Sequence, residues 1–202
     1  MNLDYKIRLE QEKDYREVEN LTREAFWNVY RPGCLEHYVL HQFRKSNDFV
    51  AELDFVLEKQ GRIVAHVMYA KASIQCAQNN VPIVTFGPLS VLPKEQGKGY
   101  GSALVRYSLE KAKELGFKAV AITGNLNFYG KLGFELGKDK NVVYADDPEA
   151  EYFLVKELEE GFLEGIAGTY KDPQGYFVDE QEAEIFDQQF PQKEKLKTDG
   201  QL

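Results

Sequence analysis

The first half of the chain carries its apolar residues first at helical and then at strand-like spacing. Residues 14–26 and 35–45 repeat them every three or four positions, which predicts two helices, and Asp14 is a candidate N-cap for the first. Gln60-Gly61 indicates a hairpin turn between two strands. Short apolar runs predict strands over residues 6–9, 49–58, 62–77 and 81–92. The pattern therefore predicts a short strand, two helices and a β-meander.

Helices and strands alternate in the middle of the chain. Residues 99–115 are predicted to form an amphipathic helix that ends before Gly116, a residue type favoured just after a helix. Its expected inner stripe is Leu104, Tyr107, Ser108, Ala112 and Leu115. A short helix is predicted at 125–132, and strands over 117–123, from 134 and over 151–157. This order predicts an α/β fold (α+β around one mixed sheet) for residues 1–160.

Beyond residue 160 the pattern predicts a separate C-terminal extension, residues 161–202. Glycines at positions 161, 165, 168 and 175 indicate a β-ribbon. Asp179 then caps an acidic helix over residues 180–190, and residues 193–202 are expected to form a frayed tail. Ala183, Phe186 and Phe190 lie on one side of that helix. That side is buried either against the same chain or in a homodimer, and both stay open.

The composition is that of an ordinary globular protein, with 43% hydrophobic and 29% charged residues among 202. No apolar run approaches the ~20 residues of a membrane span, and the first residues lack the apolar stretch of a signal peptide. Cys34 and Cys76 form neither a disulfide framework nor a metal-ligand pair. We therefore expect a cytoplasmic protein with reduced thiols and no membrane partner.

The net charge of −8 argues against a nucleic-acid partner held through its phosphates. The charge is unevenly placed, because residues 94–118 hold six Lys/Arg and three Glu, whereas residues 146–187 hold fourteen acidic residues and two lysines. One interpretation is an anion site in a chain that otherwise attracts cations. The other is a solvated acidic face with ordinary surface lysines. Both stay open.

The segment that follows the last meander strand is the most specific feature of the chain. The apolar run ends at Pro93, and Gly97, Gly99 and Gly101 then lead directly into the predicted helix. Glycines before a helix expose backbone N–H groups, and these bind an anion such as a diphosphate.

Two nucleotide-binding loops do not fit this segment. A Walker A loop needs glycine at position 92 and Ser or Thr after Lys98, where this chain has Leu92 and Gly99. A dinucleotide fingerprint needs Gly or Ala at position 104, where this chain has Leu104.

A third pattern fits: Gln96-x-x-Gly99-x-Gly101 resembles the acetyl-CoA pyrophosphate loop of the GNAT N-acetyltransferase superfamily. Roughly 30 residues later, the run from Tyr129 to Phe134 is similar to the Y-x-K-x-G-F element of that superfamily, and its surroundings resemble the YhbS-like branch. The resemblance implies a GNAT-like acyl-CoA N-acyltransferase fold. It also implies an acetyl-CoA-dependent enzyme that moves the acetyl group, by direct attack, to a primary amine of a small molecule or peptide.

The resemblance also implies which residues form the site. Tyr129 is the expected general acid, which protonates the departing thiolate, and no metal is needed. Asn125 is expected at the pantetheine amides, although capping of the helix is at least as good a role for it. The remaining cofactor-binding residues lie at the end of the strand and in the glycine turn: Leu89, Ser90, Val91, Leu92, Gln96, Gly97, Lys98, Gly99, Tyr100, Gly101 and Ser102.

Neither the general base nor the acceptor follows from the sequence. Glu24, Glu52 and His66 are candidates for the base, and none stands out. His37 and His41 share a helix face, but a third metal ligand is not evident. The acidic C-terminal half favours a cationic acceptor. The alternative to an enzyme is a catalytically silent acyl-CoA-binding sensor or interaction module.

Overall fold

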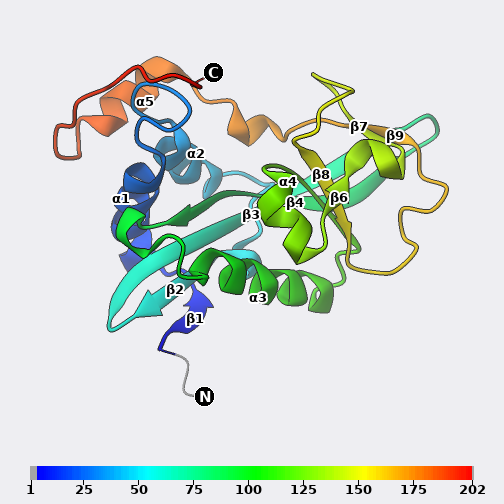
Figure 1. Ribbon diagram of the computed structural model, residues 1–202, viewed down its shortest axis with the longest axis horizontal. Coiled ribbons are helices and arrows are strands. Elements are labelled where there is room, and N and C mark those ends of the chain that lie inside the picture. The colour runs from blue at the N-terminus through cyan, green and yellow to red at the C-terminus, as the bar shows by residue number, and fades with distance from the viewer. Residues whose placement is uncertain (1–3, 202) are drawn as a thin grey trace. The chain divides into compact units, whose positions relative to one another are not determined.

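A computed structural model describes residues 4–201 (Figure 1). The chain divides into two units whose segments alternate along the sequence. Unit 1 consists of Met1–Met68, Pro88–Leu104 and Gln174–Leu202, and unit 2 of Tyr69–Gly87 and Val105–Pro173. Three long elements contribute residues to both units: β3 (Arg62–Cys76), β4 (Asn80–Val91) and α3 (Tyr100–Glu114).

Unit 1 contains the two predicted N-terminal helices and the first antiparallel strands. β1 pairs with β2, and β2 pairs with the first part of β3. The predicted hairpin joins β2 to β3, with Gln60 and Gly61 at φ of 51° and 76°. The other elements of this unit are β1 (Lys6–Leu9), α1 (Tyr15–Phe26), α2 (Glu36–Phe43), β2 (Phe55–Lys59) and α5 (Glu180–Asp187).

Unit 2 contains the mixed part of the sheet. The strand order is β3-β4-β5-β8-β6, with β9 paired to β3 and β7 paired to β9. β4 and β5 are parallel and are in register at Val84 and Val120, whereas β5 and β8 are antiparallel. The further elements are β5 (Ala119–Thr123), α4 (Leu126–Tyr129), β6 (Glu135–Leu136), β7 (Val142–Tyr144), β8 (Phe153–Glu157) and β9 (Gly168–Tyr170). The predicted mixed sheet is confirmed.

Helix α3 has the predicted bounds to within one residue, but part of its predicted inner stripe is wrong. Tyr107 is 36% exposed and Leu115 is 50% exposed. The buried stripe instead runs through Leu104, Val105, Ser108, Leu109 and Ala112. Successive positions in this stripe are one and three residues apart, and the buried face is rotated from the predicted one so that it includes Val105 and Leu109 in place of Tyr107 and Leu115. Gly116 ends the helix at φ of 87°, as predicted.

The predicted strand over residues 49–58 begins later than expected, at Phe55. A 3₁₀ turn, Ala51–Leu53, precedes it. This turn places Val50 and Leu53 three residues apart on one side, where they are 4% and 0% exposed. The apolar residues of this segment therefore enter the core through a turn, which a strand pattern alone does not reveal.

The predicted β-ribbon over residues 161–175 is also wrong. The structure places one strand there, β9, which joins the sheet of unit 2 between β3 and β7. Gly168 in β9 faces the β3 backbone so closely that a Cβ would lie 2.6 Å from the carbonyl oxygen of Gln75. Glycine at this position therefore allows two strands to approach, rather than marking a turn of a separate ribbon.

The end of the chain is a C-terminal strap, residues 174–201, and the predicted frayed tail is wrong. Trp27 Nε1 and Asn28 Nδ2 donate hydrogen bonds to the carbonyl oxygen of Glu194, at 2.8 and 3.1 Å. The Lys193 ammonium lies 3.0 Å from the Glu24 carboxylate. The polar residues of the strap are thus held in place by side chains at the end of α1, which bind its backbone and its charged groups.

A buried ion pair joins the strap to α1. The Arg23 side chain is only 1% exposed, and Asp187 accepts from its Nε at 2.5 Å and from its Nη2 at 3.1 Å. The helix predicted over residues 180–190 ends at Asp187, but its predicted inner residues are confirmed, because Ala183 and Phe186 of α5 and Phe190 just after it form one buried cluster with Tyr38. The strap is thus attached by an apolar cluster and by a desolvated charge pair.

We expect Asp187→Ala to lower the free energy of unfolding by about 3–5 kcal/mol, because it leaves the Arg23 charge buried without its partner. Glu184→Ala is the matched control. Glu184 lies on the same helix and pairs with Lys195, but it is 60% exposed, so the expected loss is less than about 1 kcal/mol. Urea unfolding of both variants measures the difference, and equal losses would contradict the role of the buried pair.

Candidate active site

The turn between β4 and α3 needs glycine for its backbone conformation. Gly97 and Gly99 have φ of 74° and 86°, in the left-handed region, and a Cβ at either would meet nothing within 4 Å. Other residues adopt this region at a cost of roughly 1–2 kcal/mol. These two glycines therefore let the chain pass from the 3₁₀ turn Pro93–Glu95 into α3 without strain.

The start of α3 offers free backbone donors. Helical bonding begins where Ala103 N donates to Gly99 O, at 2.9 Å. The N–H groups of Tyr100, Gly101 and Ser102 therefore have no acceptor within the helix, and they open at its positive end. These three predicted cofactor-binding residues can donate to an anion through their backbone.

The backbone just before the turn is already engaged. Leu92 N donates to Val64 O at 2.9 Å, and Leu92 O accepts from Glu95 N at 2.8 Å. The Gln96 side chain donates to Val91 O at 3.1 Å. Of the predicted cofactor residues, Leu92 and Gln96 therefore use these groups to shape the turn. Donors for an anion lie later, from Gly97 onward.

The polar side chains in this stretch also have internal partners. The buried Ser90 hydroxyl lies 2.9 Å from that of Thr22 on α1, so Ser90 faces the core. Lys98 Nζ lies 3.1 Å from a Glu95 carboxylate oxygen. The Tyr100 hydroxyl accepts from Lys59 Nζ at 2.7 Å. Leu89 is half-buried. The side chains of the predicted residues thus hold the turn in place.

Tyr129 lies in unit 2 at the end of α4, and three aromatic rings surround its own. The ring centroids of Phe86, Phe128 and Phe134 lie 5.8, 4.8 and 5.6 Å from that of Tyr129. Gly133, at φ of 84°, reverses the chain so that Phe134 is buried beside Tyr129. The Y-x-K-x-G-F element is therefore a device that fixes this tyrosine ring.

Asn125 caps helix α4. Its Oδ1 accepts from Asn127 N at 2.8 Å, and its carbonyl oxygen accepts from Tyr129 N at 3.0 Å. The capping role left open by the sequence is thus present in the structure. The side-chain amide nitrogen of the exposed Asn125 is not needed for the cap and can still donate to a ligand.

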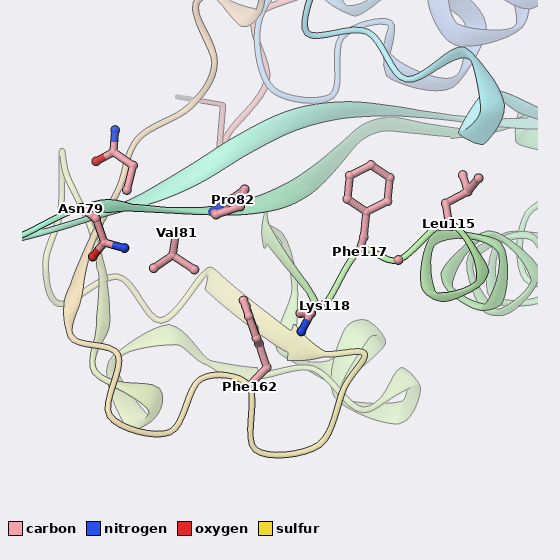
Figure 2. A pocket seen from close by; sticks show the side chains of 9 residues that line it. Asn79, Val81, Pro82, Leu115, Phe117, Lys118 and Phe162 are labelled. Carbon is pink, nitrogen blue, oxygen red and sulfur yellow. The ribbon is translucent and has the colours of Figure 1, made fainter.

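A surface hollow of about 460 Å³ lies in unit 2, beside the residues that directly follow α3 (Figure 2). The Phe162 ring borders it and lies 5.6 Å from the Lys118 ammonium. None of the predicted site residues lines this hollow. Its lining is Asn79, Asn80, Val81, Pro82, Leu115, Gly116, Phe117, Lys118 and Phe162.

The three candidates for the general base differ in their surroundings. Glu52 is exposed, and Glu24 pairs with Lys193. His66 is completely buried on β3, and its Nε2 lies 2.6 Å from Asp54 Oδ1. Burial lowers the pKa of His66 to about 4, so that its imidazole is neutral at pH 7.

The two histidines of α2 turn to different partners. His37 Nδ1 lies 3.4 Å from Cys34 Sγ, and its Nε2 lies 3.1 Å from Asp187. His41 Nδ1 lies 2.9 Å from Glu19 Oε1. Each imidazole is therefore part of the packing between α2 and its neighbours.

A buried cluster of charged residues around His66 was not predicted from the sequence. Glu10, Asp54 and His66 offer ligand-type atoms within 4.8 Å of one another. The Arg44 guanidinium already donates to both oxygens of Glu10, at 2.6 and 3.0 Å, and to Glu19 at 2.9 Å. The Arg44 guanidinium thus already supplies a positive charge to the Glu10 carboxyl group of this cluster. The one sequence signal was a lone histidine in the apolar run 62–70.

Burial raises the pKa of both carboxyl groups in this cluster. The pKa of Glu10 rises to about 8, because the group is desolvated and bonded to Asp54, although His66 and Arg44 oppose the shift. Burial likewise raises the pKa of Asp54 to about 6. The pair therefore retains a proton at neutral pH.

With this geometry in place, comparison with known proteins identifies the family. The profile of the acetyltransferase (GNAT) family matches residues 14–134, more than half of the chain. The chain belongs to this family. The match contains the glycine turn and ends at Phe134, so the two motifs noted in the sequence are both inside it. Among residues 4–201, no helix combines the length and the apolar character needed to cross a membrane.

Solved structures of GNAT proteins share the fold. The family acetyltransferase YhbS from Escherichia coli, in complex with CoA, is 25% identical with a TM-score of 0.76, covering 87% of this chain and 93% of that one. A Brucella melitensis family member, in complex with acetyl-CoA, is 22% identical with a TM-score of 0.68, covering 86% of this chain and 98% of that one. The predicted fold class is confirmed.

A curated relative matches a smaller part of the chain. It is the uncharacterized N-acetyltransferase YjhQ of Escherichia coli strain K12, 27% identical over 103 residues. The match covers 46% of this chain and 57% of that protein, so the chain spans little more than half the length of this relative.

We expect the buried proton of the Glu10–Asp54 pair to make the stability fall as the pH rises from about 6.5 to about 8. In this range an unfolded glutamate, with its pKa near 4.5, is ionised, whereas the folded Glu10 still binds a proton below about pH 8. The folded state is therefore favoured at low pH and loses that advantage as the pH rises. His66 is neutral in both states across most of this range and adds little to the slope.

Glu10→Gln mimics the protonated form, so its free energy of unfolding is expected to stay flat over the same range. Glu12→Gln, at an exposed glutamate two residues away, is expected to keep the slope of the parent protein. Urea unfolding at several pH values measures all three. A slope that survives Glu10→Gln unchanged would contradict the assignment.

Proposed function

We propose that this chain is an acetyl-CoA-dependent N-acetyltransferase that acetylates a primary amine by direct attack. The observation that carries the proposal is the glycine turn with its left-handed Gly97 and Gly99 at the start of α3, inside the region matched by the GNAT family. Two further facts support it: the fold neighbours were solved with CoA and with acetyl-CoA, and Tyr129 sits in a fixed aromatic setting.

In the proposed reaction the turn binds the diphosphate of acetyl-CoA. Backbone N–H groups from Gly97 to Ser102 donate to its oxygens, and the positive end of α3 favours its charge by up to about 1–2 kcal/mol. Glycine keeps the backbone open to the ligand, because no Cβ projects at Gly97 or Gly99. The cofactor is therefore recognised mainly by main-chain groups.

In this reaction the acetyl group passes from the CoA sulfur to the amine nitrogen, and a net proton passes from the amine to the sulfur by way of solvent and Tyr129. The amine nitrogen attacks the thioester carbonyl carbon, the C–S bond breaks, and the thiolate takes a proton from the Tyr129 hydroxyl. The acetylated nitrogen loses a proton to solvent, and the Tyr129 phenolate takes up a proton from solvent. A phenol with a pKa near 10 can protonate a thiolate whose pKa is near 8.5. Asn125 is proposed to donate its amide to the pantetheine arm.

The acceptor is proposed to be a small molecule or peptide that carries a primary amine and a second positive charge. The support is the excess of fourteen acidic residues over two lysines between residues 146 and 187. Three acids of α5 are already engaged, since Asp187 pairs with Arg23, Glu180 with Arg31 and Glu184 with Lys195. In unit 2, Glu149 and Glu151 are 89% and 85% exposed and share one lysine, Lys138, whose Nζ lies 3.7 and 4.0 Å from their carboxylates. The two acids therefore keep a net negative charge that can attract a cation.

We expect a thiol-release assay with acetyl-CoA to show turnover with diamines, polyamines or lysine peptides in preference to matched monoamines. The preference in kcat/KM should fall from low to high salt, because exposed charges are screened. Equal rates at all salt concentrations would contradict the cationic acceptor. Binding of CoA esters without turnover of any amine would favour a silent acyl-CoA-binding module, and no binding at all would overturn the proposal.

We expect Gly99→Ala to raise KM for acetyl-CoA roughly five- to thirty-fold, because a strain of about 1–2 kcal/mol distorts the turn. Gly61→Ala is the matched control, since Gly61 has a similar φ of 76° and equally open surroundings, but lies in the β2–β3 hairpin. Steady-state kinetics compares the two. A Gly99→Ala enzyme with the KM of the Gly61→Ala enzyme would contradict diphosphate binding at this turn.

A further inference from the structure

Gly124 lies between β5 and α4, and the Tyr129 ring occupies the space that a side chain at position 124 would need. A Cβ built on Gly124 would lie 2.7 Å from Tyr129 Cδ2 and nearer still to Cε2. Carbon atoms that are not bonded pack at about 3.5–4.0 Å. An alanine at this position therefore requires either the backbone or the ring to move by about 1 Å.

The backbone at Gly124 is anchored. Its N–H donates to Tyr152 O at 2.7 Å, and the preceding strand β5 pairs along its whole length with β8. The φ of Gly124 is not in the left-handed region. A left-handed φ is therefore not what requires glycine here, and the nearby tyrosine ring is.

The ring has few other places to go. Phe86, Phe128 and Phe134 border it, with centroids 4.8 to 5.8 Å away. Phe86 packs in turn on the fully buried Tyr69, at 5.1 Å. If the Tyr129 ring is displaced, its hydroxyl therefore moves with it, because the neighbouring rings leave no room for a rotation that would keep the hydroxyl in place.

We propose that Gly124 is the positioning residue for Tyr129. Because Gly124 has no side chain, the ring of the proposed proton donor can pack directly against the backbone at this position. This inference rests on the proposed function, since it assumes that the Tyr129 hydroxyl serves the reaction. A shift of about 1 Å in a reacting group can lower the rate by about 10²-fold. Gly124 acts only through Tyr129 and touches no substrate in this proposal.

A second glycine provides a matched control. Gly130 follows Tyr129 directly and has φ of −58°, and a Cβ there would meet the Leu126 side chain at ordinary distances, 3.5 Å to Cδ1 and 3.9 Å to Cγ. Gly130→Ala therefore introduces the same methyl group beside the same tyrosine without pressing on its ring.

The experiment measures kcat and KM for acetyl-CoA in the full chain with Gly124→Ala and Gly130→Ala, each alone and combined with Tyr129→Phe. We expect Gly124→Ala to lower kcat about 10- to 100-fold with KM for acetyl-CoA unchanged, and Gly130→Ala to stay within about two-fold of the parent. In the Tyr129→Phe background the hydroxyl is gone, so Gly124→Ala should change kcat by less than about two-fold.

Unfolding measurements distinguish a displaced Tyr129 hydroxyl from a general loss of folded structure. Phenylalanine retains the ring, so Gly124→Ala should destabilise the parent and the Tyr129→Phe protein equally, while only the parent loses kcat. In a Tyr129→Ala background the ring is absent, and the loss of stability should largely disappear. If Gly124→Ala alone does not fold, restored folding in the Tyr129→Ala background supports the same contact, and failure to fold there overturns it.

The outcomes distinguish this inference from the function on which it rests. A Tyr129→Phe enzyme that is slow, beside a Gly124→Ala enzyme at the parent rate, overturns the role of Gly124 alone. A Gly124→Ala loss in kcat that is equally large in the Tyr129→Phe background does the same. A Tyr129→Phe enzyme with the kcat of the parent instead overturns the proposed proton donor.

Discussion

The need to neutralise buried charge organises unit 1. Arg23, Arg44, Glu10, Asp54 and Glu19 all have side chains that are almost inaccessible to water. A desolvated charge without a partner is far more costly than a lost surface ion pair, so each must find an opposite charge or share a proton. The partners come from α1, the residues that directly follow β1 and α2, the turn before β2 and the strap. These segments are distant in the sequence, and charge pairing specifies which of them meet.

Local rules explain why much of the fold could be predicted. The hairpin at Gln60-Gly61, the end of α3 at Gly116 and the cap at Asp179 each depend on a few adjacent residues, so their signals are complete within a short stretch of sequence. The strap and β9 depend on remote partners instead. A polar tail bound by Trp27 and Asn28 has the same composition as a frayed one, and the difference lies wholly in what it meets.

In the candidate site, too, the features that depend on local sequence could be predicted, and those that depend on remote partners could not. The glycine turn follows from backbone geometry, and the family element around Tyr129 follows from its spacing, so both could be predicted. The cluster of Glu10, Asp54, His66 and Arg44 could not, because its members come from four separate segments and each has an ordinary surface explanation. Leu92 and Gln96 show a subtler limit: the right region was predicted, but not that their polar groups are used to build the turn.

The pairing of Arg23 with Asp187 also bears on synthesis of the chain. The two residues are separated by 164 positions, so the partner of Arg23 leaves the ribosome long after α1 does. Translation proceeds at about 5–20 residues per second, so α1 is exposed for many seconds with an uncompensated guanidinium on the face that it will later bury. The sheet of unit 2 can form during that interval, whereas the packing of α1 is completed only once Asp187 has been synthesised.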